Sequence, residues 1–178
     1  MHKDIERVLF RDDEIQARIL ELGAAIAKDY EGKNPVMIAV LKGSFVFMAD
    51  LVRAMDLPCQ IEFLGVSSYG SKSETTGAVR ITRDLEGDIE DRHVIVVEDI
   101  LDSGLTLNYL LGYLQSRQPK SMEICALLDK PERRRVEVSP RYTGFTIPDA
   151  FVVGYGLDFA ERYRNLPYIG VLKPEVYQ

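Results

Sequence analysis

Three acidic residues stand beside a turn of small residues that has the composition of an anion site. Glu98, Asp99 and Asp102 precede Ser103-Gly104-Leu105-Thr106, and leucines then recur at helical spacing. Free N–H groups at a helix start, together with the two hydroxyls of this turn, favour a phosphate through geometry and the helix dipole. Carboxylates repel a phosphate unless they bind something else, such as sugar hydroxyls, a divalent cation or a proton to be removed. A ribose 5-phosphate offers all three partners.

The composition limits the class of protein. A chain of 178 residues with 46% hydrophobic residues suits a single domain over 1–178. Its 22 basic and 28 acidic residues give a formal charge of −6, which argues against nucleic acid as a partner. The first residues are charged where a signal peptide needs an apolar core, and no run approaches the roughly 20 apolar residues of a spanning helix. We therefore expect a cytoplasmic protein with no membrane partner.

Predicted strands and helices alternate along the chain, which favours an α/β fold with a mainly parallel sheet. Apolar residues at helical spacing predict a first helix that follows a possible Asp12 cap and ends near Gly32. A helix is also expected over 44–55, and the polar stretch between Tyr69 and Arg80 is expected to be a loop. Strands are expected over 36–41, 60–68, 94–97, 122–128, 150–154 and 168–172.

Several segments resemble one enzyme family. The run Glu98-Asp99-Ile100-Leu101-Asp102-Ser103-Gly104-Leu105-Thr106 after an apolar strand resembles the phosphoribosyl pyrophosphate (PRPP) motif of type I phosphoribosyltransferases. Other segments resemble hypoxanthine and hypoxanthine-guanine phosphoribosyltransferases: Leu41-Lys42-Gly43-Ser44, Ser68-Tyr69-Gly70, Leu128-Asp129-Lys130-Pro131 and the stretch from Phe151 to Asp158. The resemblance implies a type I phosphoribosyltransferase fold, in which helices flank the central sheet, with a small hood and a mobile loop that starts at Ser68 and Tyr69.

The resemblance also implies a reaction. Such enzymes join N9 of a 6-oxopurine base to the anomeric carbon of PRPP and release pyrophosphate with the assistance of Mg²⁺. The expected substrates are hypoxanthine and also guanine, giving IMP and GMP for purine salvage, and the expected assembly is a homodimer or homotetramer. A transferase that prefers xanthine and a regulator that binds nucleotides or RNA without turnover remain open alternatives. A generic Rossmann cofactor domain is disfavoured because GxGxxG is missing after the strands.

By the resemblance, the PRPP site includes two further segments. Lys42, the Gly43 backbone and Arg164 are expected to hold pyrophosphate. A glycine after the strand over 36–41 lets the backbone approach a cluster of oxygens, although a simple helix-entry turn would also explain it. Family members carry a cis peptide bond before a non-proline residue in this loop, which corresponds here to Leu41–Lys42.

The resemblance assigns the base site to residues that follow later strands. Asp102 matches the general base or hydrogen-bond acceptor at purine N7, and we favour the role of orienting the base. Lys130 would donate to the exocyclic O6 and so reject adenine. Phe151 would stack on the purine while the Val152 backbone reads its edge. The base-binding set is completed by Asp158.

The expected metal ligands are Glu98, Asp99 and, through water, Asp158, since Mg²⁺ usually keeps several waters. Glu98 and Asp99 could instead accept hydrogen bonds directly from the ribose hydroxyls, or the acids could simply cap the next helix. The three arginines over 133–135 are interpreted as a solvated, charged turn.

Overall fold

The computed structural model describes residues 1–68 and 79–178. Its helices and strands, in chain order, are η1 His2–Asp4, β1 Ile5–Phe10, α1 Asp12–Asp29, β2 Val36–Leu41, α2 Phe45–Ala54, β3 Gln60–Ser68, β4 Val79–Arg83, β5 His93–Leu101, α3 Leu105–Gln115, β6 Ser121–Asp129, η2 Pro131–Arg133, β7 Tyr142–Thr146, β8 Val152–Val153, β9 Ile169–Leu172 and α4 Pro174–Tyr177. Within these ranges, no helix is both long enough and apolar enough to span a membrane.

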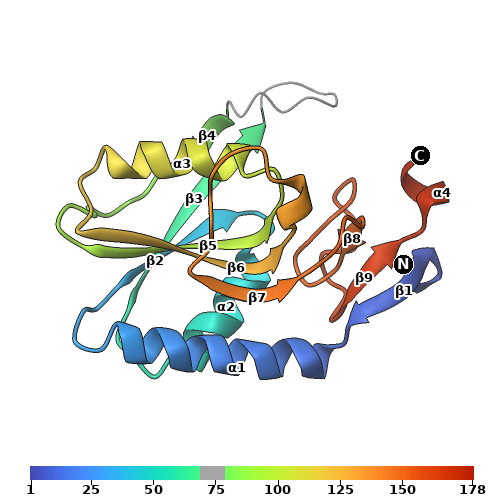
Figure 1. Ribbon diagram of the computed structural model, residues 1–178, viewed down its shortest axis with the longest axis horizontal. Coiled ribbons are helices and arrows are strands. Elements are labelled where there is room, and N and C mark those ends of the chain that lie inside the picture. The colour runs from blue at the N-terminus through green and yellow to red at the C-terminus, as the bar shows by residue number, and fades with distance from the viewer. Residues whose placement is uncertain (69–78) are drawn as a thin grey trace.

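A central sheet with the strand order β4-β3-β2-β5-β6-β7 forms the middle layer. All of its neighbouring strands are parallel except β3 and β4, which are antiparallel. Helices α1 and α2 cover one face of the sheet and α3 covers the other (Figure 1). Strand β2 is apolar on both sides for this reason: Met37 and Ala39 pack with α1 and α2, whereas Ile38 and Val40 pack with α3. The predicted α/β fold with a mainly parallel sheet is confirmed.

A second, three-stranded antiparallel sheet, β1-β9-β8, forms a hood beside the central sheet. Both chain termini lie on this side of the molecule (Figure 1). The sequence did not predict β1, where charged residues interrupt the apolar pattern, nor β7. The strand expected over 150–154 is only Val152–Val153.

Three boundaries differ from those predicted. Helix α1 begins at Asp12, so its N-cap is Arg11, whose backbone N–H donates to Glu14 Oε2 at 2.9 Å. The helix ends at Asp29, slightly before the expected end. Val79, at the end of the stretch expected to be a loop, belongs to β4. The rest of that expected loop, including Tyr69, lies outside the described residues, and of Ser68 only the backbone is described, as the last residue of β3.

Candidate active site

Two cavities share a wall formed by the end of β5 and the turn into α3. The larger has a volume of about 700 Å³ and extends to the hood, and the smaller, of about 240 Å³, lies at the start of α3. Asp99, Ile100 and Asp102 line both cavities. Of the expected site residues, the larger cavity also takes in Lys130, Phe151, Val152 and Asp158, and the smaller takes in Gly43, Glu98, Leu101, Ser103, Gly104 and Thr106.

The two acids of β5 are held in the interior. Glu98 is only 8% exposed, and its burial, followed by the nearby charge of Asp99, raises its pKa well above the ordinary value. Burial also raises the pKa of Asp99 to about 6, although Asp99 Oδ1 accepts a hydrogen bond of 2.8 Å from the Ile100 N–H. Adjacent carboxylates that resist ionisation suit a site that takes up a cation or sugar hydroxyls.

The loop after β2 lies directly against Asp99. A Cβ atom at Gly43 would overlap Oδ2 of Asp99, so this close approach requires glycine. The preceding Leu41–Lys42 peptide bond is cis, as the resemblance implied. The loop expected to hold pyrophosphate is therefore a neighbour of the acids on β5.

Asp102 has an acceptor atom that nothing in the described residues satisfies. Its Oδ1 is buried and accepts no hydrogen bond. Arg133 Nε is 3.1 Å away, so the contact is an ion pair without an aligned hydrogen bond. The same guanidinium lies 3.4 Å from the Asp149 carboxylate. The interpretation of the arginines over 133–135 as merely solvated is therefore wrong for Arg133.

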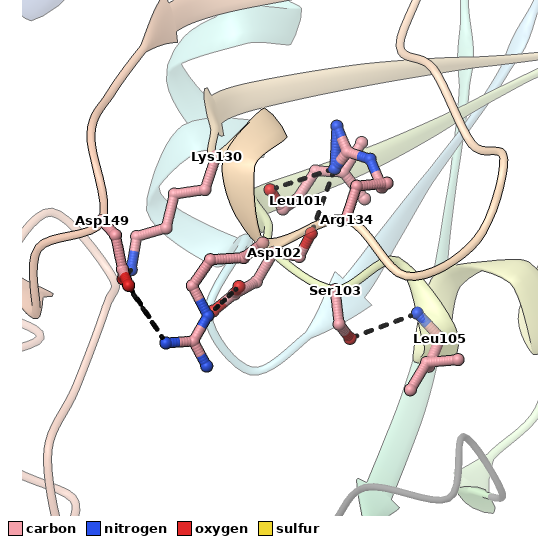
Figure 2. A network of polar contacts seen from close by, with 8 residues as sticks. Leu101, Asp102, Ser103, Leu105, Lys130, Arg134 and Asp149 are labelled. Atoms are coloured by element: carbon pink, nitrogen blue, oxygen red, sulfur yellow. Dashed lines mark hydrogen bonds and ion pairs between the residues drawn. The ribbon is translucent and has the colours of Figure 1, made fainter.

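Lys130 is a buried cation beside the turn that carries Asp102. It is 6% exposed, and its backbone N–H donates to the Leu101 carbonyl at 2.9 Å, which fixes the end of β6 next to the end of β5. Burial lowers the pKa of the ammonium group. Its Nζ is 3.9 Å from Asp149 Oδ1, and Figure 2 shows the two side chains meeting. This separation is too long for a hydrogen bond, so the ammonium can still donate to a ligand.

The turn into α3 has the form expected of a phosphate site. Ser103 Oγ accepts a hydrogen bond of 3.3 Å from the Leu105 N–H (Figure 2). Gly104 is the N-cap, with φ of +81°, a left-handed conformation that glycine adopts without strain. Ser103, Gly104 and Thr106 line the smaller cavity, so the hydroxyls and the helix start converge on it.

Arg134 holds this turn in place. Its guanidinium donates to the carbonyl oxygens of Leu101 and Asp102 at 3.4 and 3.1 Å (Figure 2). It also pairs with Asp129 at the end of β6, and its side chain is 16% exposed. The sequence interpretation of a solvated side chain is therefore wrong for Arg134 too. This arginine braces the ends of β5 and β6 against each other.

Aromatic rings gather at the hood end of the larger cavity. Phe151 stacks on Tyr177 of α4 with ring centroids 4.6 Å apart, and it meets the edge of Phe159 at 5.6 Å. Phe151 is nevertheless 38% exposed, so part of its ring remains open to a ligand. Val152 follows it in β8, with a buried side chain.

The cations expected to hold pyrophosphate lie near one shared carboxylate. Lys42 Nζ donates to Glu161 Oε2 at 3.1 Å, and Arg164 Nη2 lies 3.4 Å from Glu161 Oε1. Arg164 also pairs with Asp158 at 3.1 Å and donates to the Gly156 carbonyl at 2.7 Å. The Glu161 pKa is lowered, chiefly by the hydrogen bond from Lys42.

The three expected metal ligands do not form a ready-made cage. Over residues 1–68 and 79–178, no three or more His, Cys, Asp or Glu side chains gather in a way that could hold a metal ion. Mg²⁺ commonly binds through one or two carboxylates, with waters and substrate phosphates completing its shell. The buried Glu98 and Asp99 pair fits that donor set.

Comparisons with known proteins identify the family. The phosphoribosyl transferase domain family matches residues 11–160. The chain belongs to the phosphoribosyltransferases. It is 51% identical to the hypoxanthine-guanine phosphoribosyltransferase of Bacillus subtilis, over 100% of this chain and 99% of that protein. A solved hypoxanthine phosphoribosyltransferase from Staphylococcus aureus superimposes with a TM-score of 0.97 at 51% identity, covering 100% of this chain and 97% of the other.

A longer relative has a different organisation. The chain is 51% identical to the bifunctional protein TilS/HprT of Listeria monocytogenes over 99% of its own length, but it spans only 27% of that protein. The similarity to phosphoribosyltransferases therefore extends both to proteins of about this length and to part of a larger protein.

Sequence reasoning missed four residues that this phosphoribosyltransferase brings to its site. Arg133, Asp149 and Tyr177 line the larger cavity, and Glu161 pairs with Lys42. Asp149 and Glu161 each fall within three residues of an expected site residue, which is the signal that could have indicated them. Their partners come from distant parts of the chain, and local pattern does not reveal such contacts.

Proposed function

We propose that this chain transfers the 5-phosphoribosyl group from PRPP to N9 of hypoxanthine, and also of guanine, giving IMP or GMP and pyrophosphate. The observation that carries the proposal is the shared wall of the two cavities. Asp99, Ile100 and Asp102 line both, so one ligand can reach from a buried cation and an aromatic ring to a helix start suited to phosphate. A purine nucleotide carries a base, a sugar and a phosphate in this order. The relatives from Bacillus subtilis and Staphylococcus aureus, named for this activity, support the same conclusion.

The purine would occupy the larger cavity. Lys130 donates to O6, because a buried ammonium without a short hydrogen bond is stabilised by an acceptor that reaches it. A 6-amino group offers a donor instead, so adenine is rejected. The exposed part of the Phe151 ring stacks on the base, and the Val152 backbone meets its edge.

Asp102 would act on the reacting ring of the purine. Its unsatisfied buried Oδ1 accepts the N7–H hydrogen bond. As N9 attacks the anomeric carbon the purine becomes more acidic, and a carboxylate at N7 stabilises that change. Asp102 thereby orients the base and receives its proton or holds it.

The sugar and phosphates would lie along the wall. Glu98 and Asp99 accept hydrogen bonds from the two ribose hydroxyls or hold Mg²⁺, and the turn from Ser103 to Thr106 takes the 5-phosphate. Bound Mg²⁺ would supply charge neutralisation for the departing pyrophosphate. Asp158 belongs to this metal site through water, and it lines the larger cavity together with Asp99.

Pyrophosphate would be held at the loop after β2. Lys42 and Arg164 supply two cations, and Gly43 allows its backbone to approach the oxygens because no side chain intervenes. A single domain over 1–178 in a homodimer or homotetramer and a cytoplasmic location stay predictions.

A pyrophosphate-release assay tests the function. The protein is incubated with PRPP, Mg²⁺ and one of hypoxanthine, guanine, xanthine or adenine. We expect release with hypoxanthine and guanine and none with adenine. Preference for xanthine would support the alternative specificity, and no release with any base would leave a regulator that binds nucleotides. Calorimetry of PRPP binding with and without EDTA tests the metal, since equal affinity would leave Glu98 and Asp99 as direct sugar ligands.

A further inference from the structure

The Glu161 carboxylate lies between two cations. One of its oxygens accepts a hydrogen bond from Lys42 at 3.1 Å, and the other lies 3.4 Å from Arg164. These are the two cations assigned above to pyrophosphate. The carboxylate thus spans two cations with two oxygens, as a phosphate group would.

The backbone holds Glu161 in this position. Its φ is +61°, in the left-handed region that residues other than glycine rarely adopt. The Glu161 N–H donates to Asp158 Oδ2 at 2.9 Å, which fixes the turn. The fold of this turn therefore places the Glu161 side chain between Lys42 and Arg164.

A competing anion can also readily break the ion pair between Glu161 and Lys42. Glu161 and Lys42 have side chains that are 65% and 68% exposed, and ion pairs so open to water are weak. Pyrophosphate carries several negative charges and can contact both cations at once. It would replace the single charge of Glu161 at little cost.

We propose that Glu161 is a resident counter-ion of the pyrophosphate site: without a ligand its carboxylate neutralises Lys42 and, together with Asp158, Arg164, and it is displaced when pyrophosphate or the pyrophosphate group of PRPP binds. This inference rests on the proposed function, because it needs those cations to be the pyrophosphate ligands. The consequence is that Glu161 weakens the binding of both anions and thereby favours release of the product.

Titration calorimetry with inorganic pyrophosphate at a fixed Mg²⁺ concentration tests the proposal. Glu161→Gln keeps the size of the side chain and removes its charge. We expect it to bind pyrophosphate about 3- to 10-fold more tightly, with an unchanged KM for hypoxanthine. The gain should shrink at high salt, which screens exposed charges. Glu31→Gln, at an exposed position after α1, is the matched control for net charge and should bind like the parent.

A double-mutant cycle with Lys42→Met shows whether the effect passes through the shared cation. Lys42→Met should weaken pyrophosphate binding, and Glu161→Gln should then give a smaller gain in that background. If Glu161→Gln binds no more tightly than the parent while Lys42→Met still weakens binding, the counter-ion role alone is overturned. Weaker binding in Glu161→Gln would likewise overturn it and make Glu161 a ligand. A parent that binds no pyrophosphate, or a Lys42→Met variant identical to it, removes the proposed pyrophosphate site and the counter-ion together.

Discussion

The two ends of the site neutralise their charges in different ways. At the end that we propose for the base and sugar, Glu98 and Lys130 are 8% and 6% exposed, and Asp102 has an oxygen without a hydrogen bond. At the end that we propose for pyrophosphate, Lys42 and Glu161 are largely exposed and already paired. The first end has charge partners, Arg133 for Asp102 and Asp149 for Lys130, but among the described residues no hydrogen bond to Asp102 Oδ1 or from the Lys130 ammonium, so a ligand can still supply those bonds. At the second end the exposed charges are already paired and hydrogen-bonded.

This difference predicts that substitutions at the two ends will change activity to different extents. Water or salt cannot replace a buried side chain that binds the ligand, so removing that side chain should cause a large loss of activity. An exposed group with a partner can be replaced by water or salt, so its removal should cause a small change of either sign.

Asp102→Asn should give the largest effect. Asparagine keeps the size and one acceptor but loses the charge that stabilises the base as it loses a proton. We expect kcat to fall by roughly 10- to 1000-fold while PRPP binding survives. Steady-state kinetics and PRPP calorimetry measure the two quantities, and the deficit should shrink at higher pH, where more purine is already deprotonated. Full activity in this variant would return Asp102 to the role of a helix cap.

Lys130→Met should lower kcat/KM for hypoxanthine by roughly 100-fold, because the O6 acceptor loses its donor and the site loses a buried charge. PRPP affinity should hardly change, since Lys130 lies at the base end. Kinetics with each substrate varied in turn provide the measurement. An equal loss of PRPP binding would contradict the division between the two ends.

Asp99→Asn should stabilise the metal-free protein. The pKa of Asp99 is raised from 3.8 to about 6 in the folded protein, so between these values the folded state keeps a proton that the unfolded chain has released. Stability therefore falls as the pH rises through this window. The variant cannot ionise there, and we expect its free energy of unfolding to exceed that of the parent by on the order of 2 kcal/mol above the window.

Urea unfolding in EDTA at about pH 8 and about pH 4 measures this difference. It should nearly vanish at the lower pH, where the parent carboxyl is also neutral. Asp56→Asn, at an exposed position after α2, is the control and should show no such dependence. A gain that persists unchanged at about pH 4 would point to packing and not to charge.

Arg133→Met should give the smallest effect. Its ion pair with Asp102 joins side chains that are 50% and 43% exposed, so it is worth no more than about 1 kcal/mol. We expect kcat/KM for hypoxanthine to fall by about 2- to 5-fold, because Asp102 loses a group that orients it. Arg135→Met removes the same charge from an exposed neighbour and should match the parent. An increase for Arg133→Met would mean that the base end also contains a displaceable counter-ion.

Local patterns were enough to predict much of the central sheet. Continuous apolar runs indicated β2 and β3, and the change from strand to helical spacing indicated the segment from β5 to α3 that carries Asp102. Most of the expected site residues line the two shared cavities because they follow the ends of parallel strands, which meet at one edge of a sheet.

The hood and the pairing of charges could not be predicted in this way. Strand β1 contains Glu6 and Arg7, so its pattern does not indicate a strand, and its stability depends on β9 at the other end of the chain. The contacts of Arg133 with Asp102 and of Glu161 with Lys42 likewise depend on tertiary structure. The sequence alone does not distinguish a charged loop residue that is solvated from one that forms an ion pair in the folded protein.

The pairing of β1 with β9 has a consequence for the order in which the protein is completed. Strand β1 is synthesised near the beginning of the chain, yet in the described residues its strand partner, β9, follows more than a hundred residues later. Neither strand pairs with the central sheet, so the strands of that sheet can begin to pair during translation before β1 has its partner. Glu6, Arg7, Val171 and Leu172 all line the larger cavity. The larger cavity, which we propose holds the purine, is therefore completed only after β9 has been synthesised, well after the turn into α3 that we propose for the phosphate.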